Sequence, residues 1–124
     1  MSSSTPYAAQ IRTIELLERE KAQTSELKLY RDGAQLVPTA ATYTLIKPTG
    51  ADLLTGQTAS IAESGTVSYA HSAEQLKASE NLGEGYVQEW TITIDGEQYL
   101  FRRMAALAEN GLRPSQHLLH QPST

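Results

Sequence analysis

The run from Gly85 to Met104 restricts the fold most, because it can form one β-hairpin in which almost every side chain has a suitable face. Asp95 and Gly96 are the residues expected in a tight two-residue turn. On either side of that turn, side chains alternate between an apolar and a polar face. The apolar face carries the residues that we predict to form the structural core: Tyr86, Trp90, Ile92, Ile94, Tyr99 and Phe101.

This turn also sets the pairing of the two strands. Trp90 comes to lie opposite Phe101 on the apolar face, and Glu89 meets Arg102 on the polar face. A shift of the turn by one residue would place the indole against Arg102 and lose both matches. The sequence therefore predicts a β-sandwich or barrel with a buried tryptophan.

Composition limits the class of protein. A chain of 124 residues is long enough for one domain with a core of its own. There is no cysteine, which rules out disulfides and thiolate chemistry and fits folding in a reducing cytoplasm. No apolar run approaches the roughly 20 residues of a membrane span, and residues 1–6 lack the features of a secretory signal. We therefore expect a soluble chain with no membrane partner.

The net charge of −4 is unevenly distributed. Residues 34–101 carry two basic and eight acidic side chains, whereas residues 102–124 carry three basic side chains and one acidic side chain. An acidic surface repels phosphate groups. We therefore expect no binding of nucleic acid by the central domain.

Further short strands precede the hairpin. They are predicted over residues 26–31, 34–37, 42–47, 57–62 and 66–70, with turns at 32–33, 48–50, 55–56 and 63–65. Residues 11–24 fit either a short helix or strands, and we favour strands. Ser72 and Gln75 have the spacing of a capping box, which predicts a short connecting helix carrying Leu76.

About seven short strands with regularly spaced turns are typical of an all-β, immunoglobulin-like antiparallel β-sandwich. We place this sandwich at residues 11–104. Residues 1–10 are predicted to form a flexible N-terminal arm, because they hold too few apolar side chains to pack. Residues 105–124 are predicted to form a C-terminal helix and arm, since 105–109 favour a helix and Asn110-Gly111 would end it.

No set of residues indicates catalysis, a cofactor or a metal. His117 and His120 would share a face of a helix, but the third histidine, His71, is distant and no cysteine joins them. The carboxylates between Glu15 and Glu20 are interleaved with basic residues, which is typical of a solvated face. Neither a phosphate-binding glycine loop nor a nucleophile elbow is present. We therefore predict a protein that is not an enzyme.

Five segments together resemble small immunoglobulin-like virion proteins of tailed bacteriophages. These segments are Ala41–Gly50, Gly65–Tyr69, Leu82–Tyr86, Glu89–Gly96 and Phe101–Arg103. Tyr86 is also similar to the tyrosine corner of immunoglobulin-type domains, although the paired cysteines are missing and the tryptophan follows the tyrosine.

The resemblance implies a structural protein of the virion that joins the head-to-tail connector or neck as a homo-oligomer, through contacts of its arms and loops with other virion proteins. Candidate partner contacts are Tyr7, Arg103, Arg113, His117 and His120. Decoration of the capsid is a closely related alternative. A carbohydrate- or surface-binding module that uses exposed Tyr7, Tyr30 or Tyr43 is an alternative from a different class, and an enzyme is the third.

Overall fold

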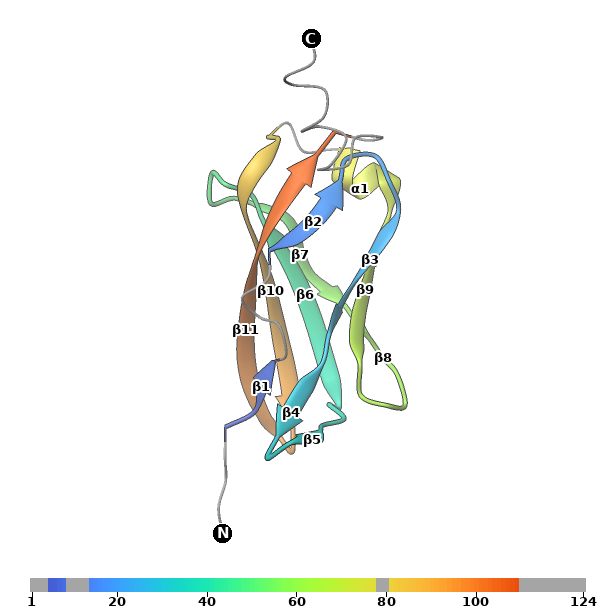
Figure 1. Cartoon of the computed structure of the whole chain (residues 1–124), viewed down its shortest axis with the longest axis vertical. Coiled ribbons are helices and arrows are strands. Elements are labelled where there is room, and N and C mark those ends of the chain that lie inside the picture. The colour runs from blue at the N-terminus through green and yellow to red at the C-terminus, as the bar shows by residue number, and fades with distance from the viewer. Residues whose placement is uncertain (1–4, 9–13, 78–80, 110–124) are drawn as a thin grey trace, which may run out of the picture.

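The structure is a computed structural model that describes residues 5–8, 14–77 and 81–109 (Figure 1). Its one helix within these ranges is α1 (Ala73–Lys77). The strands in chain order are β1 (Tyr7–Ala8), β2 (Glu15–Glu18), β3 (Gln23–Leu27), β4 (Leu29–Arg31), β5 (Ala34–Gln35), β6 (Ala40–Ile46), β7 (Asp52–Thr58), β8 (Ser60–Ile61), β9 (Val67–His71), β10 (Gly83–Ile94) and β11 (Glu97–Ala108).

The strands form two facing layers (Figure 1). One layer is a five-stranded sheet in the order β2-β11-β10-β6-β7. The opposite layer contains the three-stranded sheet β3-β9-β8, and β4 follows β3 after a single residue and pairs with β1 and β5. The order matches strands C, F and G facing strands B, E and D of the immunoglobulin fold. The predicted all-β, immunoglobulin-like sandwich is therefore confirmed, with more and shorter strand segments than the expected seven.

The hairpin register is as predicted. Trp90 pairs with Phe101 and Glu89 with Arg102, and both turn residues have positive φ, 52° at Asp95 and 82° at Gly96. The predicted core residues of β10 are at most 3% exposed, with Trp90 at 0%. Tyr99 and Phe101 are only partly buried against this core, because the layer opposite the turn end is the small sheet β1-β4-β5.

The helix predicted for 105–109 is wrong, because β11 continues to Ala108. Ala105 and Leu107 are buried and alternate with less buried neighbours, which is the period of a strand. This end of β11 has a strand on each edge, β10 on one side and β2 on the other. Backbone pairing on both edges outweighs the helix propensity of alanine and leucine.

The flexible N-terminal arm predicted for residues 1–10 is wrong at Tyr7 and Ala8. These two residues pair with Leu29 and Tyr30 of β4, and Ala8 belongs to the buried core. The small side chain of Ala8 fits into the interior at this end of the sandwich. The short strand β1 is therefore held by backbone pairing and by burial of this side chain.

Residues 14–24 contain strands, as favoured, but β2 runs parallel to β11, so the sandwich is not wholly antiparallel. The turn predicted at 55–56 is wrong, because β7 passes through these residues with an irregular register. Gly56 has φ of 53° and donates its amide proton to Thr44 Oγ1 at 2.9 Å. The capping box before α1 is confirmed, since Ser72 and Gln75 bond each other reciprocally at 2.9 and 3.1 Å.

Candidate functional site

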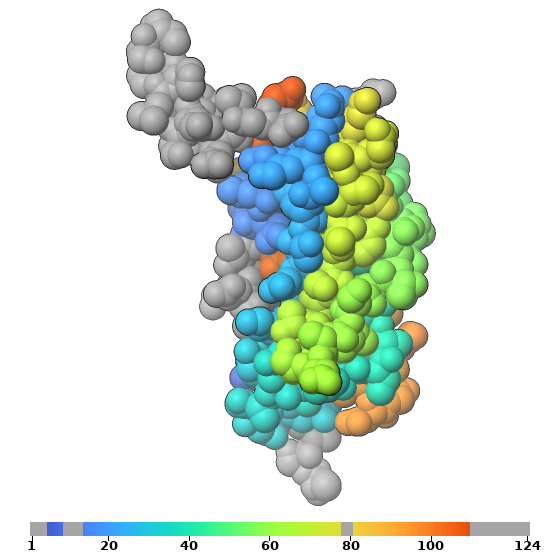
Figure 2. Space-filling model, turned by 90° about the vertical axis from the view of Figure 1, so that its right-hand side faces the viewer, coloured from blue at the N-terminus to red at the C-terminus, as the bar shows by residue number. Residues whose placement is uncertain are grey.

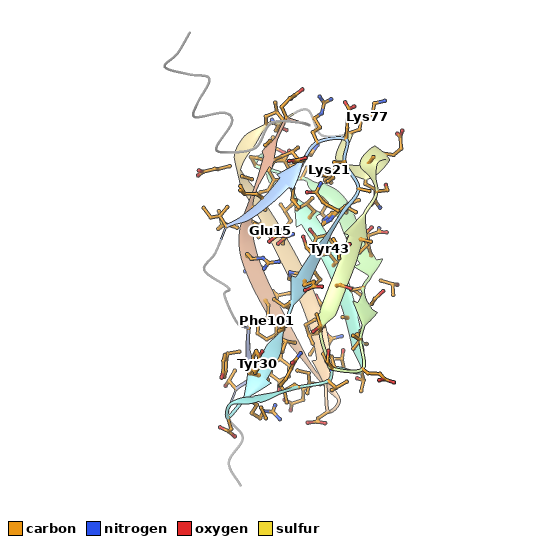
Figure 3. The ribbon with its side chains drawn as sticks, turned by 45° about the vertical axis from the view of Figure 1, so that its right-hand side comes forward. Glu15, Lys21, Tyr30, Tyr43, Lys77 and Phe101 are labelled. Carbon is orange, nitrogen blue, oxygen red and sulfur yellow. The ribbon has the colours of Figure 1, made fainter. Side chains whose placement is uncertain are left out.

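The interior contains a polar network that joins the two layers. Its members are Glu15 on β2, Ser25 on β3, Tyr43 on β6, His71 on β9, Gln88 on β10 and Arg103 on β11. Figure 3 shows Tyr43 between the layers and Glu15 at the start of β2. Sequence reasoning did not predict this network, so we describe it residue by residue as the candidate site.

Gln88 is the centre of the network. Its Nε2 donates to Ser25 Oγ and to Tyr43 Oη, each at 2.9 Å. Its Oε1 accepts a hydrogen bond from Nε of Arg103 at 2.9 Å. Both amide protons and the amide oxygen therefore have partners, which is the condition for burying this side chain at 0% exposure.

The position of Gln88 follows from the tyrosine corner. The hydroxyl of Tyr86 donates to the carbonyl of Asn81 at 2.5 Å, five residues upstream, as this motif requires. In antibody domains the residue two positions after this tyrosine is a cysteine, which forms a disulfide with strand B. Here that residue is Gln88, and it bonds Ser25 of β3. A hydrogen bond thus takes the place of the disulfide between the layers.

Arg103 was predicted to contact a partner, but it is 8% exposed and points into the sandwich. Its Nη2 donates to the carbonyl of Glu26 at 3.1 Å and lies 3.8 Å from Oε1 of Glu15. The cause is the alternation of β11, which places Arg103 on the same face as Phe101 and Ala105 and Arg102 on the outer face. The same alternation in the sequence is the signal that could have identified this buried charge.

Glu15 and Ser25 close one branch of the network. Ser25 Oγ accepts from Gln88 and donates to Oε2 of Glu15 at 2.9 Å. The carboxylate of Glu15 thus lies beside both a hydroxyl donor and the guanidinium of Arg103. The solvated face expected for these carboxylates is therefore wrong at Glu15, whose side chain is 26% exposed and faces the network, where it gives the buried arginine an opposite charge.

Tyr43 and His71 form the other branch. Nδ1 of His71 lies 3.0 Å from the carbonyl oxygen of Gln23, which can only accept, so Nδ1 carries a proton. In the neutral ring Nε2 is then an acceptor for the Tyr43 hydroxyl, 2.8 Å away. Burial lowers the pKa of His71 below its usual 6.5 and raises the pKa of the Tyr43 hydroxyl above its usual value. Both shifts favour the uncharged forms.

Aromatic rings surround this branch. Tyr43 stacks on Tyr69 with ring centroids 4.7 Å apart and lies 4.6 Å from Trp90. His71 contacts both tyrosine rings edge-on. Figure 2 shows the outer side of the layer above the network, where β3 (blue) and β9 (yellow-green) lie side by side. Ser25, His71 and Gln88 are at most 1% exposed, so a substrate does not reach them in this conformation.

The surface tyrosines of the carbohydrate-binding alternative have separate positions. Tyr7 is 51% exposed and stacks on Tyr30 with centroids 5.9 Å apart. Tyr43 is 0% exposed, so its assignment to a surface site is wrong. It points inward because it shares a face with Leu45, which is also buried.

Three predicted partner contacts, Arg113, His117 and His120, lie outside the described residues. Within the described ranges, no three histidine, aspartate or glutamate side chains are close enough together to hold a metal ion. In the same part of the chain, no helix is long and apolar enough to span a membrane.

Comparison with known proteins gave distant structural likenesses. No family model matches the sequence, and no curated protein matches it. A chimeric titin Z1Z2 carrying a decorin peptide is 12% identical, with a TM-score of 0.46, and the match covers 89% of this chain and 100% of that one. Dpr1 IG1, from its structure bound to DIP-eta IG1, is 13% identical, with a TM-score of 0.45, covering 86% and 96%. The immunoglobulin-like domain of human leucine-rich repeat-containing protein 4 is 14% identical, with a TM-score of 0.37, covering 91% and 97%.

Proposed function

We propose that this chain is a non-enzymatic structural protein, a virion component of a tailed phage that joins the head-to-tail connector or neck. The observation that carries the non-enzymatic role is the closed interior network. Its titratable side chains form hydrogen bonds and ion pairs within the network and with the backbone, and they lie between the two layers of strands. Such a network stabilises one arrangement of the sheets and leaves the surface to make contacts.

The virion role rests on the resemblance of five sequence segments to small immunoglobulin-like phage proteins. A rigid sandwich with additional chain at its ends suits such an assembly, because terminal segments can add to neighbouring subunits. In this proposal Arg113, His117 and His120 contact neighbouring virion proteins. Decoration of the capsid surface is the alternative position for the same protein.

Electron microscopy of purified particles tests this proposal. Antibody labelling or density for the chain in a ring on the tail axis would support the connector, and copies spread over the capsid lattice would support decoration. Absence of the chain from particles, measured by mass spectrometry, would reject both positions.

A carbohydrate-binding role has one supporting observation, the half-exposed Tyr7 stacked on Tyr30. Aromatic faces of this kind stack on sugar rings. Calorimetric titration with oligosaccharides tests this role. Saturable binding that is lost in Tyr7→Ala but kept in Leu82→Ala, an exposed position on another segment, would favour it over the structural role.

A further inference from the structure

A small apolar patch lies on the outer face of the five-stranded sheet, where β2 and β11 run side by side. Leu16 on β2 is 53% exposed, Met104 on β11 is 51% exposed, and Ile14, directly before β2, is 45% exposed. Leu16 pairs with Ala106 of β11, and the same parallel register, continued by two residues, brings Ile14 level with Met104. The side chains between them, such as Leu17, are buried in the core, so these four share the outer face. We call Ile14, Leu16, Met104 and Ala106 the β2–β11 patch.

The patch has clear limits. Leu100 lies outside it, because Arg102 stands between Leu100 and Met104 on the same face of β11. On β10, Glu84 lies directly opposite Ala106 and is exposed. The ion pairs within the described part of the chain do not include Glu84. The patch is therefore apolar on β2 and β11 and has a carboxylate on its β10 side.

The segment that follows β11 has a composition that complements this patch. Residues 110–124 lie outside the described residues. They include Leu112, Leu118 and Leu119, they contain no aspartate or glutamate, and Arg113 is their one lysine or arginine. Leucine side chains can cover the apolar part of the patch, and the guanidinium has the charge opposite to the carboxylate at its side.

The starting point of this segment places it beside the patch. β2 and β11 are parallel and end side by side, with Ala108 as the last residue of β11 (Figure 1). Met104 lies four residues before Ala108, roughly 13 Å along the strand, and Leu16 is nearer. About ten residues of extended chain span up to roughly 33 Å, so residues 109–118 can reach every part of the patch. Asn110-Gly111 is a sequence favoured in tight turns, which would direct the chain back toward it.

The returning segment would lie over the sheet rather than extend it. Both edges of β11 are occupied at this end, by β10 on one side and β2 on the other. At the outer edge of β2, the Gln23 side chain accepts from the amide of Glu18 at 3.0 Å and donates to its carbonyl at 2.8 Å. That edge is therefore already blocked at the end nearest to the segment. The inner face is filled by the core, so the outer face is where the leucines can be buried.

We propose that residues 110–124 fold back and dock through their leucines on the β2–β11 patch of the same chain, with Arg113 toward Glu84. A tether this short gives the segment an effective concentration in the millimolar range at the patch, whereas a second copy is present only at its bulk concentration. The segment of the same chain is therefore favoured over a second copy. This inference goes beyond the proposed function and does not rest on it. In the proposed virion role, the segment leaves the patch before Arg113 contacts a neighbouring protein.

Oxidation of methionine by hydrogen peroxide tests the proposal in the full chain. The sequence has two methionines, so Met1 is an internal reference for Met104. The double variant Leu118→Ser with Leu119→Ser should raise the oxidation rate of Met104, relative to that of Met1, about tenfold, which corresponds to a segment docked for about nine-tenths of the time.

The matched control is Gln116→Ser with Gln121→Ser, two polar changes on either side of the leucines. It should leave the oxidation rate of Met104 unchanged. Both double variants alter residues beyond the end of β11, so the sandwich itself keeps its sequence.

Introduced cysteines give a second, independent measurement, since the chain has none of its own. Leu16→Cys with Leu118→Cys should form a disulfide within one chain under mild oxidation, because the two side chains meet at the patch. Val37→Cys with Leu118→Cys is the control, since Val37 is 55% exposed but lies outside this sheet. The control pair should form its disulfide much more slowly.

The results expected from a docked segment are slow oxidation of Met104 at every protein concentration and a fast disulfide in the Leu16 pair. Equal oxidation rates of Met104 in the unchanged chain and in the leucine variant would overturn the proposal, as would equal rates of disulfide formation in the two cysteine pairs. Protection of Met104 that grows with protein concentration would also overturn it, because a second copy would then cover the patch.

Discussion

Nε2 of Gln88 donates a hydrogen bond to Oγ of Ser25 at 2.9 Å, and this bond joins β10 in one layer to β3 in the other. In immunoglobulin domains with the conserved disulfide, the corresponding strands F and B are joined covalently. In a chain without cysteine, the connection depends on side chains that are all partnered. The sandwich is thereby linked by a network that needs no oxidation.

Replacing Gln88 should therefore cost much more than the loss of one hydrogen bond. Gln88→Ala leaves the buried Arg103 without its amide acceptor and removes the donor to Tyr43. We expect the free energy of unfolding to fall by about 2–4 kcal/mol, because buried polar groups left unpaired carry their full desolvation cost. Urea denaturation measures this change. Gln98→Ala, at an exposed position on β11, is the control, and a similar loss in both variants would contradict a central role for Gln88.

The sequence predicted the β10–β11 hairpin almost completely, because alternation and the Asp95-Gly96 turn are local signals. The network was not predicted, since its members come from strands that meet only in the folded sandwich. One member was within reach of the sequence: alternation from Phe101 places Arg103 inside. The strand at 105–108 was missed because its second neighbour, β2, lies far away in sequence.

Trp90 should be the largest single contributor to the core. Its side chain is 0% exposed and packs against Tyr43. Trp90→Ala should lower the free energy of unfolding by about 3–5 kcal/mol, as for other large-to-small aromatic changes in cores. Leu100→Ala, at a half-exposed position on β11, should cost less than about 1 kcal/mol. Strong quenching of the native indole fluorescence by iodide would show that Trp90 is not buried.

His71 should make stability depend on pH. Its pKa is lowered by burial, while the Gln23 carbonyl and the Glu15 carboxylate oppose that shift and the rings of Tyr43 and Tyr69 enclose it. The unfolded chain therefore binds a proton near pH 6.5 that the folded chain does not bind until lower pH. Stability should be full above pH 6.5 and should fall as the pH drops from there toward the folded pKa.

Urea denaturation at several pH values from about 8 to 5 checks this sign. His71→Gln keeps polar groups at the site but cannot titrate, and it retains His117 and His120, so it is the matched control. The difference in stability between the two proteins should change across this range. If stability depended on pH in the same way in both proteins, the pKa of His71 would not be lower in the folded state than in the unfolded state, and the prediction would be wrong.

Among the glycines, Gly65 is the one at which substitution by alanine should lower the free energy of unfolding most. Gly65 precedes β9 and has φ of +103°, and an added Cβ would lie 2.9 Å from the carbonyl carbon of Leu36 and closer still to its oxygen. Gly50 has a similar φ of +97°, but nothing lies within 4 Å of an added Cβ. Gly50→Ala should therefore show the cost of backbone conformation alone, about 1–2 kcal/mol. Gly65→Ala should cost clearly more in urea denaturation, since the backbone of Leu36 must also move, and equal losses would show that this close contact is absent in solution.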